Sequence, residues 1–504
     1  MSHPNQEPTP DPTTGPAQPR PSTADQIIRS LIDNVRFIRN VEGEAYIAYP
    51  EAPHRALRVD GTKSDGMLTI CQRWFASTQK WPNKDALRQV EQFVFAECMQ
   101  QAVEPVHLRA ASVGDAVYVD LGNPANEVVH ITATGFTTAT DCDAVFRRSK
   151  YTSALPSIDG VSPDVRLLQK YVRVGDEEFA VLVGCVIATW FTDIPQPIIT
   201  LLGSAKAGKT TAMQHLADLI DPTTDMPGGT LTLDPRTVQA IAKIRRPLIF
   251  DNISHVAGDE SDLLARVATG GEIIGRELYT NDDAHLTQLK RPILINGIIE
   301  GFARSDLASR TFQFELEDFA AGDRIAASVL RASWQADRPA VVAGLCELAA
   351  AVLAERLKSS PRDYEFHRNS DVLQIIEVVS ARLGVDGIAA VRASGTRMSQ
   401  TVLDASYLAD CIQRLAFPED EDDSDWSMHF TPKAFLDVAL TPATLLDRLR
   451  EVDERRAKDL PQTAKGLGEA LRRISPDLEA VAGIRLVRSR GNKGTKYTFT
   501  LAAS

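Results

Sequence analysis

The sequence PIITLLGSAKAGKTTAMQHLAD, residues 197–218, decides the fold of the central part of this chain. Ile198 to Leu202 is a short apolar run that predicts a buried strand, and the residues from Thr211 onward have a helical composition. The intervening segment fits the phosphate-loop pattern G-x-x-x-x-G-K-[ST] at every position. It consists of Gly203, Ser204, Ala205, Lys206, Ala207, Gly208, Lys209 and Thr210.

Each defined position of this pattern has a chemical reason. Gly203 and Gly208 let the backbone turn tightly and present its N–H groups to phosphate oxygens, and the following helix adds its positive dipole end. Lys209 can reach the β- and γ-phosphates, and the Thr210 hydroxyl can ligate Mg²⁺. We therefore predict that residues 203–211 bind ATP with Mg²⁺; a plain glycine turn between two core segments is the alternative.

Composition limits the class of protein. The chain has 504 residues and a formal net charge of −12, which argues against a protein that coats nucleic acid over its whole surface. The longest apolar stretch, Phe179 to Phe191, is too short to span a bilayer and predicts a buried helix. The first residues, MSHPNQEPTP, lack the features of a signal peptide, and the cysteines form no C-x-x-C pair. We expect a cytoplasmic protein with reduced cysteines.

Changes in composition and periodicity divide the chain into six parts. We predict a disordered tail over 1–23, a mixed α/β domain over 24–160, an ATPase domain over 161–320, a helical region over 321–416, an acidic linker over 417–428 and a DNA-binding domain over 429–504. Within the helical region, separate helices are predicted on the two sides of Pro339.

Two apolar strands downstream of the glycine loop end in polar residues. The first, over 247–252, reaches Asp251, whose carboxylate would hold Mg²⁺ beside Thr210. The second, over 291–297, reaches Asn296. Between them, 272–279 and 286–289 predict a β-hairpin with a polar tip. An Asp-Leu-x-x-Arg turn that ends at Arg310 follows, leading into an alternating strand.

This order of segments resembles the superfamily III helicases, which are AAA+ ring ATPases of phage, plasmid and viral replication, often joined to a primase region. The resemblance covers about 175–320 and implies a homo-oligomeric, hexamer-type ring that binds DNA. It also implies that Asn296 positions the attacking water, and that Arg310, or else Arg304, reaches the nucleotide of a neighbouring subunit. The hairpin with His285 would contact DNA. From the residues alone, Asn296 could instead cap its strand, and Arg310 could pair with Asp306.

One residue departs from the pattern of these relatives. Many of them place a second acid after the Mg²⁺ aspartate, where this sequence has Asn252. Asparagine cannot accept a proton, so general-base catalysis from this position would be lost. Slow turnover, or mainly nucleotide-switched assembly, is the expectation that follows.

The last part of the chain is basic. Residues 462–504 carry eight basic and three acidic side chains, a net charge of +5, and their predicted helices and β-hairpin resemble a winged helix. A basic hairpin of this kind suits the phosphates of DNA, and a surface that binds a protein or the acidic linker is the alternative. The candidate DNA contacts here are Lys465, Arg472, Arg473, Arg488, Arg490, Lys493 and Lys496.

These features together predict an α/β P-loop AAA+ ATPase with added domains. The leading hypothesis is an ATP-driven DNA helicase or replication initiator of a mobile genetic element. The second is a DNA-binding ATPase switch, such as an origin-binding or copy-control factor, that does not unwind DNA. A small-molecule phosphoryl-transfer enzyme is the third, and it would not require the basic C-terminal segment.

Overall fold

The computed structural model describes most of the chain, in two compact units. The first comprises residues up to Val106 together with Val145–Arg147, and the second comprises His107–Ala144 and Arg148 onward. The residues described are 21–204, 207–224, 234–253, 256, 258–276, 284–297, 307, 309–319, 325–358, 360, 362–364, 366–404, 406–417, 435–491 and 494–502. Residues 1–20 of the tail predicted over 1–23, the hairpin tip and most of the predicted acidic linker lie outside them.

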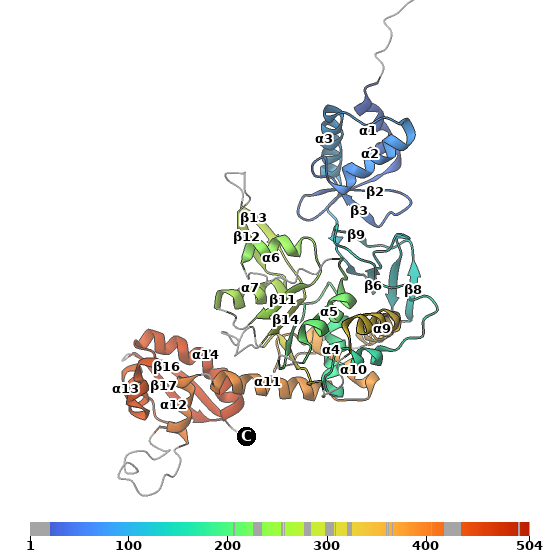
Figure 1. Ribbon diagram of the computed structural model, residues 1–504. Coiled ribbons are helices and arrows are strands. Elements are labelled where there is room, and N and C mark those ends of the chain that lie inside the picture. Colours follow the sequence, from blue (N-terminus) through green and yellow to red (C-terminus); the bar gives the residue numbers. More distant parts are fainter. Residues whose placement is uncertain are drawn as a thin grey trace, which may run out of the picture. The chain divides into compact units, whose positions relative to one another are not determined.

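The first unit packs three helices on one face of a five-stranded sheet (Figure 1). The strand order is β1-β2-β3-β9-β4, with β3 and β9 parallel. Apolar residues alternate along the strands, so that Ile47 and Leu57 pack with the helices while Tyr46 and Ala56 form a second cluster. The bounds are α1 Thr23–Asn34, β1 Arg36–Arg39, β2 Ala45–Ala48, β3 Arg55–Arg58, α2 Asp65–Thr78, α3 Lys84–Gln100, β4 Val106–His107 and β9 Val145–Arg147.

The boundary of this unit differs from the domain predicted over 24–160. Residues 107–144 form an antiparallel sheet, β5-β6-β7-β8, that belongs to the second unit. Arg109 explains the difference, because it is fully buried and donates from Nε to Asp221 Oδ1 over 2.8 Å. Asp221 is the C-cap of α5, so this ion pair, which the sequence does not reveal, joins the antiparallel sheet to the helix that follows the glycine loop. The strands are β5 Ala110–Val113, β6 Ala116–Asp120, β7 Val128–Thr132 and β8 Gly135–Ala139.

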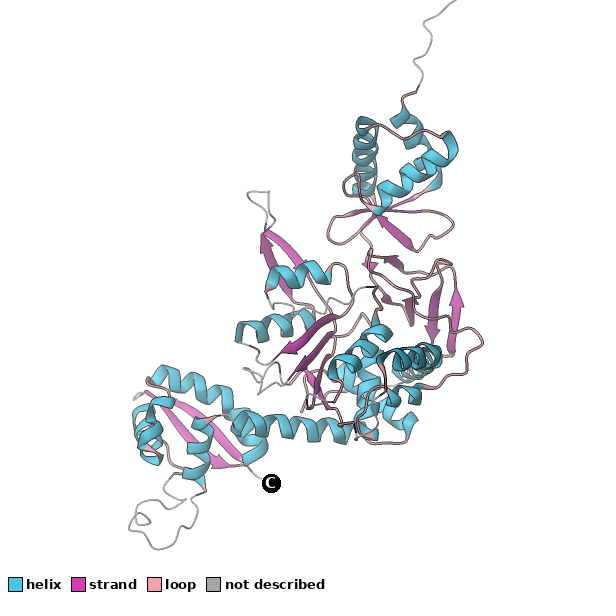
Figure 2. Ribbon diagram, in the orientation of Figure 1, coloured by secondary structure: helices cyan, strands magenta, loops and turns pink. Residues whose placement is uncertain are grey.

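A four-stranded parallel sheet forms the centre of the second unit (Figure 2). Its order is β11-β14-β10-β15, and the strands are β10 Ile198–Leu202, β11 Leu248–Ile253, β14 Ile293–Gly297 and β15 Thr311–Glu315. All three pairings are parallel, so the carboxyl ends of the strands meet at one edge of the sheet. The predicted strands at 198–202, 247–252 and 291–297 are therefore confirmed as neighbours.

Helices of the second unit bury both sides of this sheet. The stretch predicted as a buried helix is α4, in which every residue from Phe179 to Ala188 is buried. The elements of this part are η1 Val165–Lys170, α4 Asp176–Ala188, α5 Lys209–Ile220, α6 Pro235–Ala242, α7 Gly258–Thr269, β12 Glu272–Arg276, β13 Ala284–Gln288, α9 Ala327–Arg356, α10 Ser370–Leu383 and α11 Gly387–Asp404. Strands β12 and β13 form the predicted antiparallel hairpin.

Two features of the helical region differ from prediction. Helix α9 runs unbroken through Pro339, because apolar residues on both sides of the proline, such as Trp334 and Val342, are buried. Helix α12, Tyr407–Ala416, packs into the C-terminal core with Phe435 and Phe499, and Leu403 at the end of α11 joins the same core. The C-terminal domain therefore begins near residue 407 and not at 429.

The rest of that domain consists of helices and one long hairpin. Its elements are α13 Pro442–Val452, η3 Glu454–Asp459, α14 Ala464–Ala482, β16 Ile484–Gly491 and β17 Gly494–Leu501. Residues 464–482 form a single helix, α14, that continues through Pro476. All six cysteines are free, and no helix in the described part of the chain is long and apolar enough to cross a membrane.

Candidate functional site

The glycine loop connects the end of β10 to the start of α5. Gly203 and Gly208 have positive φ angles of 134° and 73°. A Cβ at Gly203 would lie 3.0 Å from the Leu316 carbonyl oxygen, and one at Gly208 would lie 3.0 Å from the Phe319 ring. Both backbone conformation and space therefore require glycine at these positions. Ala205 and Lys206 lie outside the described residues.

The Lys209 side chain folds back over this loop. Its Nζ donates to the carbonyl oxygens of Gly203 at 2.7 Å and Ser204 at 2.8 Å. The ammonium group is thus held beside the backbone that would surround a phosphate. In addition, the Ser204 hydroxyl donates a hydrogen bond to the carboxylate of Asp318, a residue just after β15. The sequence does not predict a role for Asp318, because no local pattern links this residue to the glycine loop.

Thr210, Asp251 and Asn296 meet at the carboxyl edge of the parallel sheet. Thr210 Oγ1 donates to Asp251 Oδ1 over 3.2 Å, and Asn296 Nδ2 donates to Thr210 Oγ1 over 3.4 Å. The register explains the meeting, since Leu201 pairs with Asn296 and the strand that carries Asp251 pairs with β14. Thr210 of the glycine-loop pattern and the two residues singled out from strand ends, Asp251 and Asn296, are neighbours in space.

Asn252 occupies an unusual backbone position. Its φ is 59°, in the left-handed region that asparagine tolerates better than most residues, at an irregularity in the pairing of β11 with β14. Its backbone N–H donates to Asn296 Oδ1 over 2.7 Å, and its side chain is exposed. The positive φ gives a backbone reason for asparagine at this position.

Arg310 lies at the opposite edge of the sheet from the glycine loop. The parallel register pairs Ile198 with Thr311, so Arg310 precedes β15 at the amino end of the strands. Its backbone N–H donates to the Leu307 carbonyl over 3.1 Å. Arg310 therefore cannot reach the loop of its own chain. Asp306 and Arg304 are outside the described residues, as is the side chain of His285 in β13.

Helix α9 holds α5 in place through two hydrogen bonds to Asp218. Trp334 Nε1 donates to Asp218 Oδ2 over 3.0 Å, and Arg338 donates to the Asp218 carbonyl over 2.7 Å. The His215 ring packs edge-on against Tyr171 and lies 4.6 Å from the Trp334 ring. These contacts hold the helix that positions Lys209 and Thr210.

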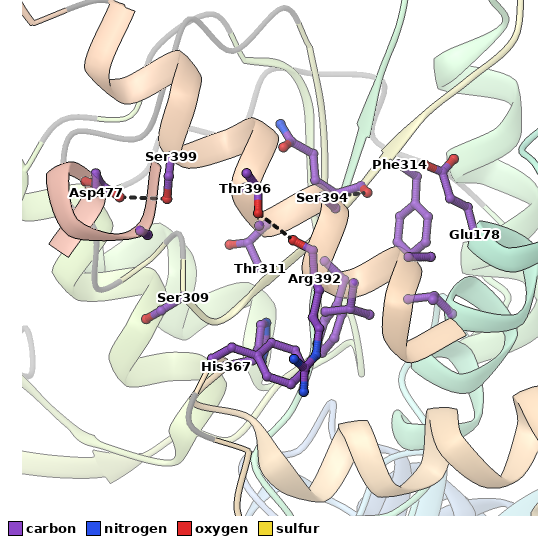
Figure 3. Close-up of a pocket in the computed structure, with 18 of the residues that line it drawn as sticks. Glu178, Ser309, Thr311, Phe314, His367, Arg392, Ser394, Thr396, Ser399 and Asp477 are labelled. Carbon is purple, nitrogen blue, oxygen red and sulfur yellow. Dashed lines mark hydrogen bonds between the residues drawn. The ribbon is translucent and has the colours of Figure 1, made fainter. Parts of the chain in front are cut away.

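A separate cavity of about 510 Å³ lies along β15 and α11, away from the glycine loop (Figure 3). At one end, Ser399 donates to Asp477 Oδ1 over 2.8 Å, and burial raises the pKa of the Asp477 carboxyl. His367 also lines the cavity, with its ring centroid 4.4 Å from that of Phe312 at an interplanar angle of 35°, and burial lowers the pKa of His367 to about 4. None of the residues predicted as catalytic lines this cavity.

The basic residues of the C-terminal hairpin divide between its two faces. Arg488 and Arg490 pair with Tyr497 and Thr495, so both project on the face that carries Ile484, whereas Lys496 projects on the other. All three cations are exposed, and within the described part of the chain they make no ion pair. The other predicted DNA contacts are Lys465, Arg472 and Arg473, exposed on α14, and Lys493, outside the described residues.

Comparison with known families covers both the part of the chain with the glycine loop and the C-terminal domain. Residues 168–400 match a model described as an actinomycete integrative conjugative element replication protein. Residues 408–504 match the C-terminal domain of the same family, which agrees with the assignment of α12 to that domain. The two models together cover about two thirds of the chain. The chain belongs to this family of replication proteins.

Solved structures give more distant matches. The SCCmec type IV Cch protein, described as an active helicase, is 12% identical, with 93% of each chain covered and a TM-score of 0.42. An apo structure of the C-terminal region of NrS-1 is 9% identical, with 96% of this chain and 100% of that chain covered and a TM-score of 0.42. None of the curated proteins compared with the sequence of this replication protein is significantly similar to it.

From the burial of His215 we predict how the free energy of unfolding of the second unit depends on pH. Burial, and then Arg338, lower the pKa of His215 to about 4, below the value of about 6.5 of an unfolded chain. The unfolded chain therefore binds a proton more readily between these values, so stability falls as the pH drops from about 6.5 to 4. His215→Phe should flatten this fall by up to about 3 kcal/mol in urea unfolding measured across the range.

The variant should match the parent in slope above pH 7, where neither state protonates the ring. His107 and His367 also have pKa values lowered to about 4, so part of the acid sensitivity will persist. Parallel stability curves for variant and parent between pH 6.5 and 4.5 would show that His215 is not a source of this sensitivity.

Proposed function

We propose that this replication protein is an ATP-dependent DNA helicase or replication initiator that hydrolyses ATP in a homo-oligomeric ring. The observation that carries the proposal is the meeting of Thr210, Asp251 and Asn296 beside the glycine loop. The strand order β11-β14-β10-β15 supports an AAA+ ATPase core. The glycine loop follows the central strand β10, and the next two strands in this order, β14 and β11, carry Asn296 and Asp251 near their carboxyl ends.

The residues present fit a nucleotide with Mg²⁺. Thr210 and Asp251 offer a hydroxyl and a carboxylate 3.2 Å apart, which are the hard oxygen ligands that Mg²⁺ prefers. Among the described residues, no group of three or more histidine, cysteine or acidic side chains could hold a metal alone. The ion would therefore depend on phosphate oxygens as further ligands, as is usual for Mg²⁺ in such ATPases. Bound Mg²⁺ would neutralise charge on the phosphates.

The chain's own residues would then act in distinct ways. Lys209 would exchange its two carbonyl partners for phosphate oxygens, and its charge would stabilise the transition state. Asn296 would orient the attacking water through the amide that now contacts Thr210. Arg310, which lies at the far edge of the sheet, would serve the nucleotide of the adjacent subunit.

The C-terminal domain supports a role in binding DNA. A helix (α12), a short bridged segment at Leu436 and Leu440, two further helices and a long hairpin follow the order of a winged helix. In this proposal the exposed Arg488 and Arg490 contact phosphates.

A DNA-binding ATPase switch without unwinding remains the second candidate. The exposed Asn252 favours it, because no carboxylate at this position activates water. ATP hydrolysis stimulated by single-stranded DNA together with strand displacement would select the helicase, whereas ATP-dependent DNA binding without displacement would select the switch.

Substitution of Lys209 and Arg310 tests the shared active site. Lys209→Ala should lose nucleotide binding, whereas Arg310→Ala should bind ATP like the parent yet hydrolyse it about 10³-fold more slowly. Mixtures of the two variants should regain part of the activity, since a ring then contains sites with an intact loop and an intact neighbouring arginine. Arg331→Ala, an exposed arginine on α9, is the control and should keep full ATPase activity.

Unchanged ATP affinity in Lys209→Ala would contradict the nucleotide site. Mixtures that never exceed the sum of their components would contradict the role of Arg310 in the adjacent subunit.

The salt dependence of DNA binding tests the C-terminal hairpin. The double variant Arg488→Gln/Arg490→Gln should lower the slope of log K against log salt by about 0.9 for each duplex phosphate that the two arginines neutralise. Arg485→Gln is the matched control on the same strand, because Arg485 is paired with Glu479 at 2.6 Å. Anisotropy titrations of labelled duplex at several salt concentrations give the slopes, and equal slopes for double variant and parent would place the DNA contacts elsewhere.

A further inference from the structure

Two aromatic rings, one in the last turn of α2 and one in the turn that leads to α3, are exposed to solvent in the first unit. Figure 1 shows the two helices. Phe75 is 44% exposed and Trp81 is 57% exposed, and their ring centroids lie 6.3 Å apart at an interplanar angle of 53°. Single exposed apolar residues are common on soluble proteins, but two large rings in contact and both open to water form a surface patch. Neither ring belongs to the nucleotide site or to the C-terminal hairpin.

The backbone around these rings is firmly held, so their exposure does not result from a frayed segment. Helix α2 ends at Gln79, in the left-handed conformation, whose N–H donates to the Phe75 carbonyl over 2.8 Å. Asn83 caps α3 by accepting from the Ala86 N–H over 2.8 Å, and Pro82 between them is buried. Trp81 therefore projects from a turn fixed on both sides.

Two lysines flank the exposed tryptophan. Lys80 and Lys84 are exposed, and in the part of the chain that the structure describes they form no ion pair. Nearby Arg73, by contrast, pairs with Glu51 and lies over the Tyr49 ring. The segment from residue 79 to 84, QKWPNK, contains no acid. We call Phe75, Lys80, Trp81 and Lys84 the aromatic turn.

We propose that the aromatic turn binds single-stranded nucleic acid, with a base stacked on Trp81 and the lysines on the adjacent phosphates. Unpaired bases offer flat faces that stack on exposed aromatic rings without regard to sequence, and lysine charge follows the backbone. Duplex DNA keeps these faces inside the helix, so the rings favour a single strand over a duplex. The proposal gives the first unit a role that the ATPase and the C-terminal domain do not supply, and it does not depend on nucleotide binding.

The fluorescence of Trp81 offers a direct test on the full chain. The other tryptophans in the described residues are less exposed to solvent than Trp81, since Trp190 and Trp334 are buried and Trp74 is half-buried. Unlabelled oligo(dT) should quench the protein's emission. Trp81→Phe should remove most of this quenching while binding oligo(dT) within about twofold of the parent, because phenylalanine keeps a stacking face. Oligo(U) in a parallel titration tells whether the turn distinguishes DNA from RNA.

Affinity provides the second measurement, in the Arg488→Gln/Arg490→Gln background so that the C-terminal hairpin contributes less. Trp81→Ala should weaken binding of labelled oligo(dT) about tenfold, and Lys80→Gln/Lys84→Gln should weaken it and reduce its salt dependence. Phe95→Ala, an aromatic residue on α3 that is 49% exposed, is the matched control and should bind like the background. Circular dichroism and thermal unfolding of each variant should match the background, since the substituted side chains are exposed.

Two results would overturn the proposal. One is quenching by oligo(dT) that persists unchanged in Trp81→Phe. The other is affinity of Trp81→Ala within twofold of its background, which would leave the aromatic turn as a surface for a protein partner. A Lys209→Ala protein that no longer binds ATP should still show the quenching, so failure of the ATPase proposal and failure of this one are distinguishable.

Discussion

The Asn296 side chain joins the parts of the candidate active site. It is almost fully buried, accepts from the Asn252 N–H and donates to Thr210 Oγ1. One amide thus fixes the tip of the strand that carries Asp251 relative to the helix that follows the glycine loop. These two hydrogen bonds of Asn296 can form because β10, β14 and β11 are parallel, so that the carboxyl ends of the three strands meet at one edge of the sheet.

Other parts of the second unit hold α5, the helix that carries Thr210, through contacts with Asp221 and Asp218. Asp221, at the end of α5, accepts from the Arg109 guanidinium and from the Arg246 N–H, and both arginines are buried. Desolvation offsets much of the attraction in a buried pair of this kind, but removal of either partner would leave a buried charge without its counterion. One turn earlier in α5, Trp334 and Arg338 hold Asp218. The helix that follows the glycine loop is therefore anchored at its C-terminal end through Asp218 and Asp221.

Much of this arrangement could be predicted from the sequence, because it depends on local patterns. Strand–loop–helix order and the polar residues at strand tips are enough to identify Thr210, Asp251 and Asn296 as neighbours. Long-range pairings could not be predicted: nothing near Arg109 points to Asp221, more than a hundred residues away. The division at residue 160, the separation of α12 from its domain and the break at Pro339 were wrong for the same reason, since tertiary packing overrides local composition there. The left-handed φ of Asn252 was equally invisible in the sequence.

A crystal structure with Mg²⁺ and a non-hydrolysable ATP analogue tests the central claim most directly. The account predicts that the β-phosphate lies within the backbone amides of residues 203–210 and that Mg²⁺ is about 2.1 Å from Thr210 Oγ1. It also predicts that Lys209 Nζ leaves the Gly203 carbonyl for phosphate oxygens, with Asn296 facing the γ-phosphate. A nucleotide bound outside the loop, or Lys209 still on its carbonyl partners in the occupied site, would contradict it.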